Sequence, residues 1–167
     1  MEFLAKNIQI EDKSVRIQFW DTAGTEKYRA ITTGHYRNAH AAVIVYDITN
    51  EVSYQNLAYW LAEIRENAGE QCLVAIMANK VDIMFREPEK REVLKEQAEQ
   101  FAKDNSCLFI DESSALADIF ITEFFEAVIQ SVFSYQMDLI SKGIKTEQQL
   151  KKLDVDMSPH FEHRCCY

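Results

Sequence analysis

A continuous apolar run at residues 41–46 constrains the fold of this chain more than any other feature. A strand without alternation between apolar and polar side chains is typical of a parallel sheet that is covered on both faces. Strand and helix patterns alternate along the chain that follows, with strands at residues 72–78 and 107–110 and helices at residues 57–64, 89–104 and 119–139. This alternation predicts an α/β fold with a mainly parallel sheet, and we expect Ser53 to cap the first helix.

The start of the chain predicts an antiparallel hairpin. Residues 2–10 and 14–20 both alternate between apolar and polar side chains, around the polar turn Glu11-Asp12-Lys13. Period-two alternation is typical of strands with one buried face. A polar loop over residues 21–38 is expected to connect this hairpin to the strand at residues 41–46.

Length and composition predict one domain inside the cell. The 167 residues are 47% apolar, which is enough to form a core. The formal charge of −9 argues against a nucleic-acid or anionic-membrane surface and favours protein partners. Because the sequence has no membrane-span, signal or transit pattern, and because Cys72 and Cys107 are expected to be small buried thiols, we predict a cytoplasmic chain without a disulfide framework.

The tetrapeptide Asn79-Lys80-Val81-Asp82 directly follows an apolar strand, where open α/β sheets bind their ligands. The carboxylate of Asp82 can accept hydrogen bonds from N1 and the exocyclic amino group of guanine, a donor pattern that adenine lacks. Asn79 can donate to the purine N7 while its oxygen ties neighbouring loops together, and the stem of Lys80 can lie over the ring. On its own, the tetrapeptide is equally compatible with a solvated loop.

A second motif, Trp20-Asp21-Thr22-Ala23-Gly24, ends the second strand of the hairpin. Asp21 is suited to hold a water molecule on Mg²⁺, and Gly24 allows a backbone N–H to approach a terminal phosphate. A turn with a solvated Asp is the alternative, and two motifs at the ends of predicted strands make it the weaker one.

A third motif, Ser114-Ala115-Leu116, follows the strand at residues 107–110. The backbone N–H of Ala115 could donate to O6 of guanine, where adenine carries an amino donor. This contact would reinforce the choice of base made by Asp82.

These motifs together resemble the Ras superfamily of small GTPases, and its Rab branch most closely. The matching segments are Glu2-Phe3-Leu4 and residues 20–29, 36–39, 45–49, 79–82 and 112–116. The resemblance implies a partial P-loop-NTPase-type three-layer sandwich and a Rab-like GTPase that binds GTP or GDP with Mg²⁺ and acts in vesicle traffic. The GTP-binding residues that it implies are Asp21, which also holds Mg²⁺ through water, Gly24, Asn79, Lys80, Asp82, Ser114, Ala115 and Leu116.

The family's phosphate loop, Gly-x-x-x-x-Gly-Lys-Ser/Thr, does not occur in these 167 residues. That loop cradles phosphates with backbone N–H groups and a Lys charge. The central first strand of the family sheet, which lies between the segments matching residues 15–19 and 41–46, is therefore expected to be missing, leaving unpaired backbone groups at about 1–3 kcal/mol each. An incomplete copy of a longer protein is the explanation we favour; closure of the gap by its two neighbours, and poor folding, stay open.

Two further sites follow from the resemblance. Thr25 stands where most relatives carry the Gln that orients the attacking water, so GTP hydrolysis is expected to be impaired unless the substitution is neutral. Phe3, Trp20 and Tyr36 match positions that many Rab proteins present to effector proteins, although aromatic residues on paired strands more often pack within the fold.

The predicted organisation is an incomplete small-GTPase domain over residues 1–140 and a flexible tail over residues 141–167. Cys165 and Cys166 resemble the doubly geranylgeranylated end of Rab proteins, which implies prenylation machinery as a partner and anchoring to the cytosolic face of endomembranes. An unmodified tail, or a metal site made by His160, His163, Cys165 and Cys166, is the alternative.

Two classes of function stay open on the sequence. The first is a Rab-type GTPase of membrane traffic. The second is a non-enzymatic remnant, or a protein-interaction module, that keeps a guanine-reading edge without useful nucleotide binding. Binding of labelled GTP distinguishes them.

Overall fold

The structure is a computed structural model that describes residues 2–21, 39–69, 71–145 and 152–159. Its strands are β1 (Glu2–Ile10), β2 (Lys13–Asp21), β3 (Ala41–Asp47), β4 (Leu73–Asn79), β5 (Leu108–Glu112) and β6 (Lys152–Pro159). Its helices are α2 (Glu51–Gln55), α3 (Leu57–Ala68), α4 (Lys95–Asp104) and α5 (Ile121–Ser141), with short 3₁₀ turns η2 (Val81–Phe85) and η3 (Pro88–Lys90). The predicted α/β fold is confirmed.

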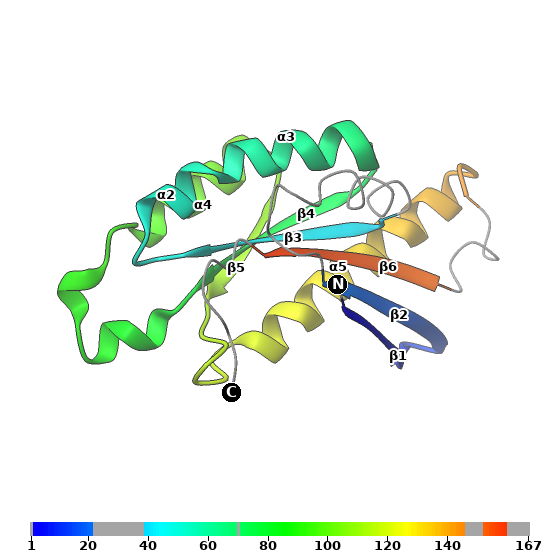
Figure 1. The fold of residues 1–167 in the computed structure, drawn as a ribbon. Coiled ribbons are helices and arrows are strands. Elements are labelled where there is room, and N and C mark those ends of the chain that lie inside the picture. The colour runs from blue at the N-terminus through cyan, green and yellow to red at the C-terminus, as the bar shows by residue number, and fades with distance from the viewer. Residues whose placement is uncertain (1, 22–38, 70, 146–151, 160–167) are drawn as a thin grey trace.

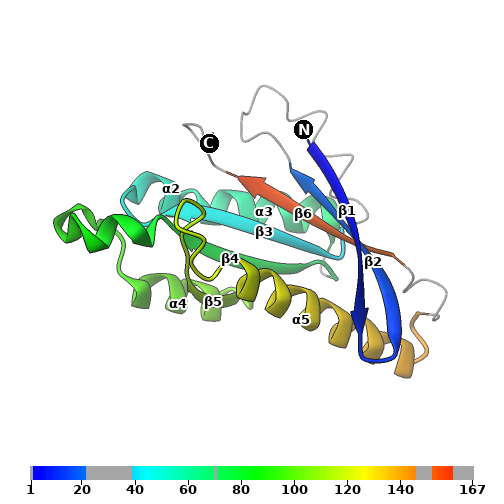
Figure 2. The same cartoon turned by 90° about the horizontal axis from the view of Figure 1, so that it is seen from below.

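The strands form one sheet in the order β1-β2-β6-β3-β4-β5. The first two strands are antiparallel and the other pairs are parallel, as the sequence predicted. Helices α2, α3 and α4 lie over one face of the sheet and α5 lies along the other (Figure 1), which is also clear when the molecule is turned (Figure 2).

The core lies on both sides of β3 and β4. Every residue of the run at 41–46 is buried. Alternate side chains of β3 point to opposite faces, so Val43 and Val45 pack in the cluster that contains α5, and Ala42 and Ile44 pack in the cluster that contains α3 and α4. The prediction of a strand covered on both faces is therefore confirmed.

Strand β6 fills the middle of the sheet. It runs parallel to β2 on one side and to β3 on the other, with Val155 level with Phe19 and with Ala41. This is the position at which we expected a missing strand, and none of the three explanations anticipated that residues 152–159 would occupy it. Pairing on both sides satisfies two rows of backbone groups that would otherwise lack partners, which is the physical reason for a strand here.

The position of β6 also differs from the expectation of a flexible segment after residue 140. Residues 152–159 belong to the sheet, and α5 extends to Ser141. The division of the chain at residue 140 stays a prediction.

Two local expectations were wrong. Ser53 lies inside α2, and the side chain of Asn50 caps that helix by accepting from the Ser53 N–H at 3.1 Å. The helix predicted to begin at residue 89 begins at Lys95, because Pro88 starts a separate 3₁₀ turn and the Gln97 side chain accepts from the Leu94 N–H at 2.8 Å.

The two cysteines that the structure describes are not joined in a disulfide. Cys72 is buried and Cys107 is partly buried, each one residue before the strand in which it was expected. Burial raises the pKa of the Cys107 thiol, which keeps the thiol protonated at neutral pH.

Candidate functional site

The carboxyl ends of the parallel strands share one edge of the sheet. Asp47 and Asn79, the last residues of β3 and β4, are level with each other. Asp21 ends β2 and is level with Met157 and Val43, so β2 stops before β3 does. The residues predicted to bind the base and the cation therefore lie on the same edge, with β6 and β3 between their strands.

Asn79 connects the loop after β4 to the loop after β5. Its side chain is buried, with 3% exposure, and its Oδ1 accepts from the Ala115 N–H at 3.0 Å. Its backbone carbonyl also accepts from the Ile48 N–H at 3.2 Å. The prediction that the Asn79 oxygen ties neighbouring loops together is confirmed, and the Nδ2 group is left as the donor for a ligand.

Asp82 is oriented by Ser114. The buried Ser114 hydroxyl donates to Asp82 Oδ1 and accepts from the Ala117 N–H at 3.0 Å. An ionised carboxylate has about four acceptor positions on its two oxygens, so this bond leaves capacity for a ligand. Ser114 therefore acts through Asp82 in this structure rather than as an independent contact.

Ala115 differs from its expected role. Its backbone N–H, which we expected to donate to O6 of guanine, donates to Asn79 in this structure. Leu116, the next residue, is 85% exposed. A base at this edge would have to share the Ala115 donor with Asn79.

Lys80 has a backbone conformation that residues other than glycine rarely adopt. Its φ is +72°, in the left-handed region, which costs a residue with a Cβ about 1–2 kcal/mol. Its Nζ forms an ion pair with Asp47 Oδ2 at 2.6 Å. The other oxygen of Asp47 accepts from Thr49 N–H at 2.8 Å and from Thr49 Oγ1 at 2.7 Å. Strain held by such a network is typical of functional sites.

Ser113 holds the loop after β5 against the end of β4, and it was missed as a site residue. It is fully buried, and its N–H and its hydroxyl both donate to the Ala78 carbonyl, at 2.7 Å and 2.8 Å. Its own carbonyl accepts from the Val81 N–H at 3.0 Å. Asp47 was also missed, although it directly follows the apolar run at residues 41–46, as Asn79 directly follows the apolar run at residues 73–78.

A charged pair lies beside this network. The Arg91 guanidinium donates two hydrogen bonds to the Glu112 carboxylate, at 2.5 Å and 2.9 Å, and this bonding raises the pKa of the guanidinium. Burial, followed by the charge of Glu112, raises the pKa of Tyr46. The Arg91 guanidinium and the Tyr46 hydroxyl therefore stay protonated across the neutral range, so the structure at this end of the sheet does not change with pH there.

Several predicted residues fall outside the described residues. These are Gly24, Thr25, Tyr36, His160, His163, Cys165 and Cys166. Phe3 and Trp20 are paired across β1 and β2. Their predicted role in effector binding therefore stays a prediction.

Asp21 is exposed at the end of β2, which fits a carboxylate that holds Mg²⁺ through water. In the described ranges no group of three or more His, Cys, Asp or Glu residues could hold a metal ion. Mg²⁺ beside Asp21 would therefore take most of its oxygen ligands from water and a nucleotide. None of the helices in the same ranges has the length and apolar character of a membrane span.

Comparison with known proteins identifies the family. The model of the Ras family matches residues 1–134, and the chain belongs to this family of small GTPases. The GTP-binding protein ypt3 of Schizosaccharomyces pombe is 41% identical over 133 residues, which cover 80% of this chain and 60% of that protein. Ras-related protein Rab-11C of Dictyostelium discoideum is 39% identical over 133 residues, covering 80% of this chain and 57% of that protein.

A third relative extends the match. Ras-related protein Rab-13 of Mesocricetus auratus is 34% identical over 159 residues, covering 95% of this chain and 73% of that protein. Within the Ras superfamily the chain is therefore Rab-like, as the motifs indicated. It spans about three-fifths of the length of the first two curated relatives.

Proposed function

We propose that the edge formed by β4 and β5 binds the base of a guanine nucleotide and that the chain acts as a Rab-like small GTPase in vesicle traffic. One observation carries this proposal: two side chains tie the loops after β4 and β5 together through the Asn79–Ala115 and Ser114–Asp82 bonds. A carboxylate that is oriented before the ligand arrives loses little entropy on binding.

The proposed contacts read guanine by hydrogen bonding. Asp82 accepts from N1 and from the exocyclic amino group, and Asn79 donates to N7 through Nδ2. The ion pair with Asp47 fixes the end of Lys80, so its apolar stem can lie along one face of the ring. Adenine would leave Asp82 without a matching donor pair, and an unpaired polar group in such a site disfavours that base strongly.

The phosphates and Mg²⁺ are proposed to lie toward Asp21. β2 and β4 are separated by β6 and β3, which places Asp21 about 14 Å from the strand before Asp82 along the sheet. A nucleotide is elongated, so its base and its phosphates can reach different strands of the same edge. We propose Asp21 as the water-mediated Mg²⁺ ligand and Gly24 as the phosphate contact.

Catalysis is proposed to be weak. Thr25 has a shorter side chain than Gln and cannot orient water and phosphate over the same reach. The sequence of 167 residues also contains no Gly-x-x-x-x-Gly-Lys-Ser/Thr segment to hold the phosphates. These two features favour a second candidate, a protein-interaction module that reads guanine weakly and hydrolyses nothing.

The partners and the location are also proposals. Effector proteins are proposed to contact Phe3, Trp20 and Tyr36. Prenylation of Cys165 and Cys166 would anchor the chain to the cytosolic face of endomembranes, since two lipid chains hold a protein far more firmly than one. The mass of protein from its own cells tests this modification.

Equilibrium binding of guanosine, GDP, GTP and adenosine tests the proposed site. We expect guanosine to bind at least about tenfold more tightly than adenosine, because only guanine matches Asp82. We expect GDP and GTP to bind little more tightly than guanosine. Equal affinity for guanosine and adenosine would contradict the site, and much tighter binding of GTP than of guanosine would contradict the weak role of the phosphates.

A further inference from the structure

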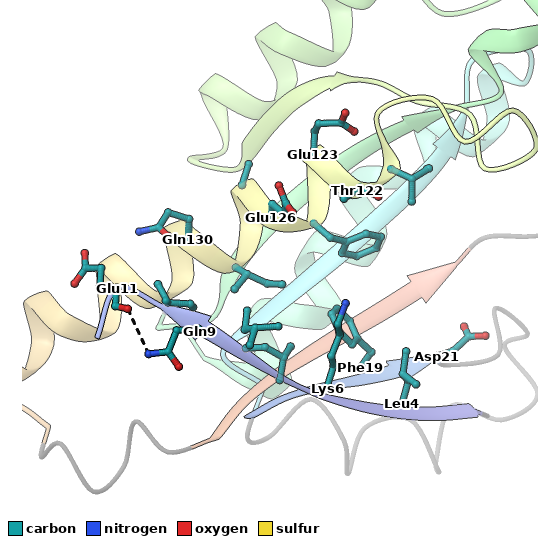
Figure 3. Close-up of a pocket in the computed structure, with 17 residues that line it drawn as sticks. Leu4, Lys6, Gln9, Glu11, Phe19, Asp21, Thr122, Glu123, Glu126 and Gln130 are labelled. Atoms are coloured by element: carbon teal, nitrogen blue, oxygen red, sulfur yellow. Dashed lines mark hydrogen bonds between the residues drawn. The ribbon is translucent and has the colours of Figure 1, made fainter. Parts of the chain in front are cut away.

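A large groove lies between the hairpin and α5; it shares Asp21 with the proposed Mg²⁺ site and contains none of the proposed base-binding residues (Figure 3). Its volume is about 1170 Å³. Ile8 and Phe19 of the hairpin and Phe125 of α5 line it, and the rings of Phe19 and Phe125 meet edge to face with their centroids 5.7 Å apart. The floor of the groove is therefore apolar and held by an aromatic contact.

The groove exists because α5 does not cover the whole of its face of the sheet. Alternate side chains of β1, among them Leu4, Ile8 and Ile10, line the groove, and Leu4 is 63% exposed. On the α5 side, no second helix from the described ranges lies over β1 and β2 (Figure 2). An apolar sheet face beside a helix is normally covered by another element.

The dimensions of the groove fit a helix. Residues 121–130 of α5 contribute to its wall, which corresponds to about 15 Å, or about three turns of an α-helix. Pockets for small molecules are smaller and more enclosed, about 300–1,000 Å³. A helix laid beside α5 would bury the exposed Leu4 side chain and the partly buried Ile8 side chain of β1.

The rim of the groove is acidic. Four of its five charged lining residues in the described ranges are acidic, namely Glu11, Asp21, Glu123 and Glu126, and the fifth is Lys6. Glu123 and Glu126 are exposed on α5, and Figure 3 shows them along the upper rim. This charge repels an anionic membrane surface, and it also repels the same rim of a second copy of the chain.

We propose that this groove is a docking surface for a basic amphipathic helix of a partner protein. The apolar face of this helix packs on Ile8, Phe19 and Phe125. The Lys or Arg side chains of the helix lie beside Glu123 and Glu126. Such a mode, in which an amphipathic helix occupies an apolar groove, recurs in peptide recognition. It requires no nucleotide, so it stands or falls separately from the proposed base-binding site.

A labelled helical peptide with leucines on one face and lysines on the other tests this docking surface by fluorescence anisotropy with the full chain. We expect saturable binding that weakens with salt, and at least about tenfold weaker binding of a peptide that carries Glu in place of Lys. A Lys/Leu peptide of scrambled order, which has no apolar face, should also bind at least about tenfold more weakly.

The matched variants are Glu123→Lys/Glu126→Lys in the rim and Glu96→Lys/Glu99→Lys on α4, which lies over the opposite face of the sheet. All four Glu side chains are exposed, so neither variant disturbs the core. We expect the rim variant to lose at least about tenfold in affinity and the α4 variant to lose none. Because a rim charge change acts at the edge of the groove, a second variant, Thr122→Trp, places a bulky side chain at an exposed lining position and should also weaken binding.

Three results would overturn the proposal. The first is an equal effect of the rim and α4 variants, which would indicate non-specific attraction to a chain of charge −9. The second is no peptide binding at all. The third is a dimer of the unmodified chain that the peptide dissociates, which would assign the groove to a second copy.

Discussion

The two halves of the sheet differ in how they are completed. In the half formed by β3, β4 and β5, helices cover both faces, and the buried side chains of Asn79, Ser113 and Ser114 each make a hydrogen bond. In the half formed by β1, β2 and β6, the groove leaves Leu4 63% exposed. Among the described residues, each half buries a side-chain oxygen without a hydrogen-bond partner, namely Gln18 Oε1 in β2 and Tyr46 Oη in β3. The first half is closed by neighbours in the chain, whereas the second depends on a strand that arrives from far along the sequence.

The largest expected effect is that of Val155→Pro in β6. Proline removes a backbone donor from a central strand and leaves a partner carbonyl unpaired, so we expect a loss of about 3 kcal/mol or more in the free energy of unfolding. Urea denaturation measures the loss. Hydrogen exchange should become fast in β2 while β4 and β5 stay protected.

Val155→Thr is the control for this variant, since it keeps the backbone N–H and a β-branched side chain. If β2 amides exchange equally slowly in Val155→Pro and in the unmodified chain, β6 does not complete the sheet, and the difference between the two halves loses its basis.

A smaller effect is expected for Asn79→Ala in the other half. The change leaves the Ala115 N–H without its partner, which costs about 1–3 kcal/mol, and should also weaken the binding of guanosine, because it removes the Nδ2 donor to N7. Asn7→Ala, at an exposed position of β1, is the matched control and should change stability by less than about 0.5 kcal/mol. Equal losses for the two variants would show that the loops are held by other contacts.

The smallest expected effect on stability is that of the ion pair between Lys95 and Asp111, which lies at β5 in the half formed by β3, β4 and β5. The bond of 2.7 Å from Lys95 lowers the pKa of Asp111, so the pair stabilises the fold above the ordinary Asp pKa and this contribution disappears as the pH falls through the lowered value. Because both side chains are more than a third exposed, Lys95→Ala should cost at most about 1 kcal/mol at pH 7.

Denaturation of the unmodified chain and of Lys95→Ala over the acid range checks this prediction. The two chains should differ at neutral pH and converge below the lowered pKa of Asp111. A difference that persists in strong acid would mean that Lys95 acts through packing instead.

Local sequence patterns were enough to predict the half of the sheet formed by β3, β4 and β5, and much of the site at its edge. The apolar run at residues 41–46 specified β3, and the position of Asn79 at the end of β4, with Asp82 three residues later, placed them at the binding edge. Donor and acceptor chemistry then predicted that Asn79 would tie two loops together. The direction of the Ala115 N–H was not predictable, because it depends on competition between Asn79 and a ligand.

The other half could not be predicted in the same way, since its completion is non-local. Leu153, Val155 and Met157 alternate with polar residues, which is a strand pattern within a segment that reads as a polar tail. The sequence of that segment does not indicate that β2 and β3 are its partners. Both strands lie more than a hundred residues earlier in the chain. The position of a central strand follows from unsatisfied backbone groups elsewhere in the sheet.

The most direct test of the account is the relative affinity for guanosine and xanthosine in Asp82→Asn. Xanthine carries a carbonyl in place of the exocyclic amino group, so an amide at position 82 should match it where a carboxylate matches guanine. We predict that the unmodified chain prefers guanosine and Asp82→Asn prefers xanthosine, each by at least about tenfold. Asp118→Asn, in the exposed turn after Ala115, should leave the preference unchanged. An unaltered preference in Asp82→Asn would contradict the assignment of this edge as the base-reading site.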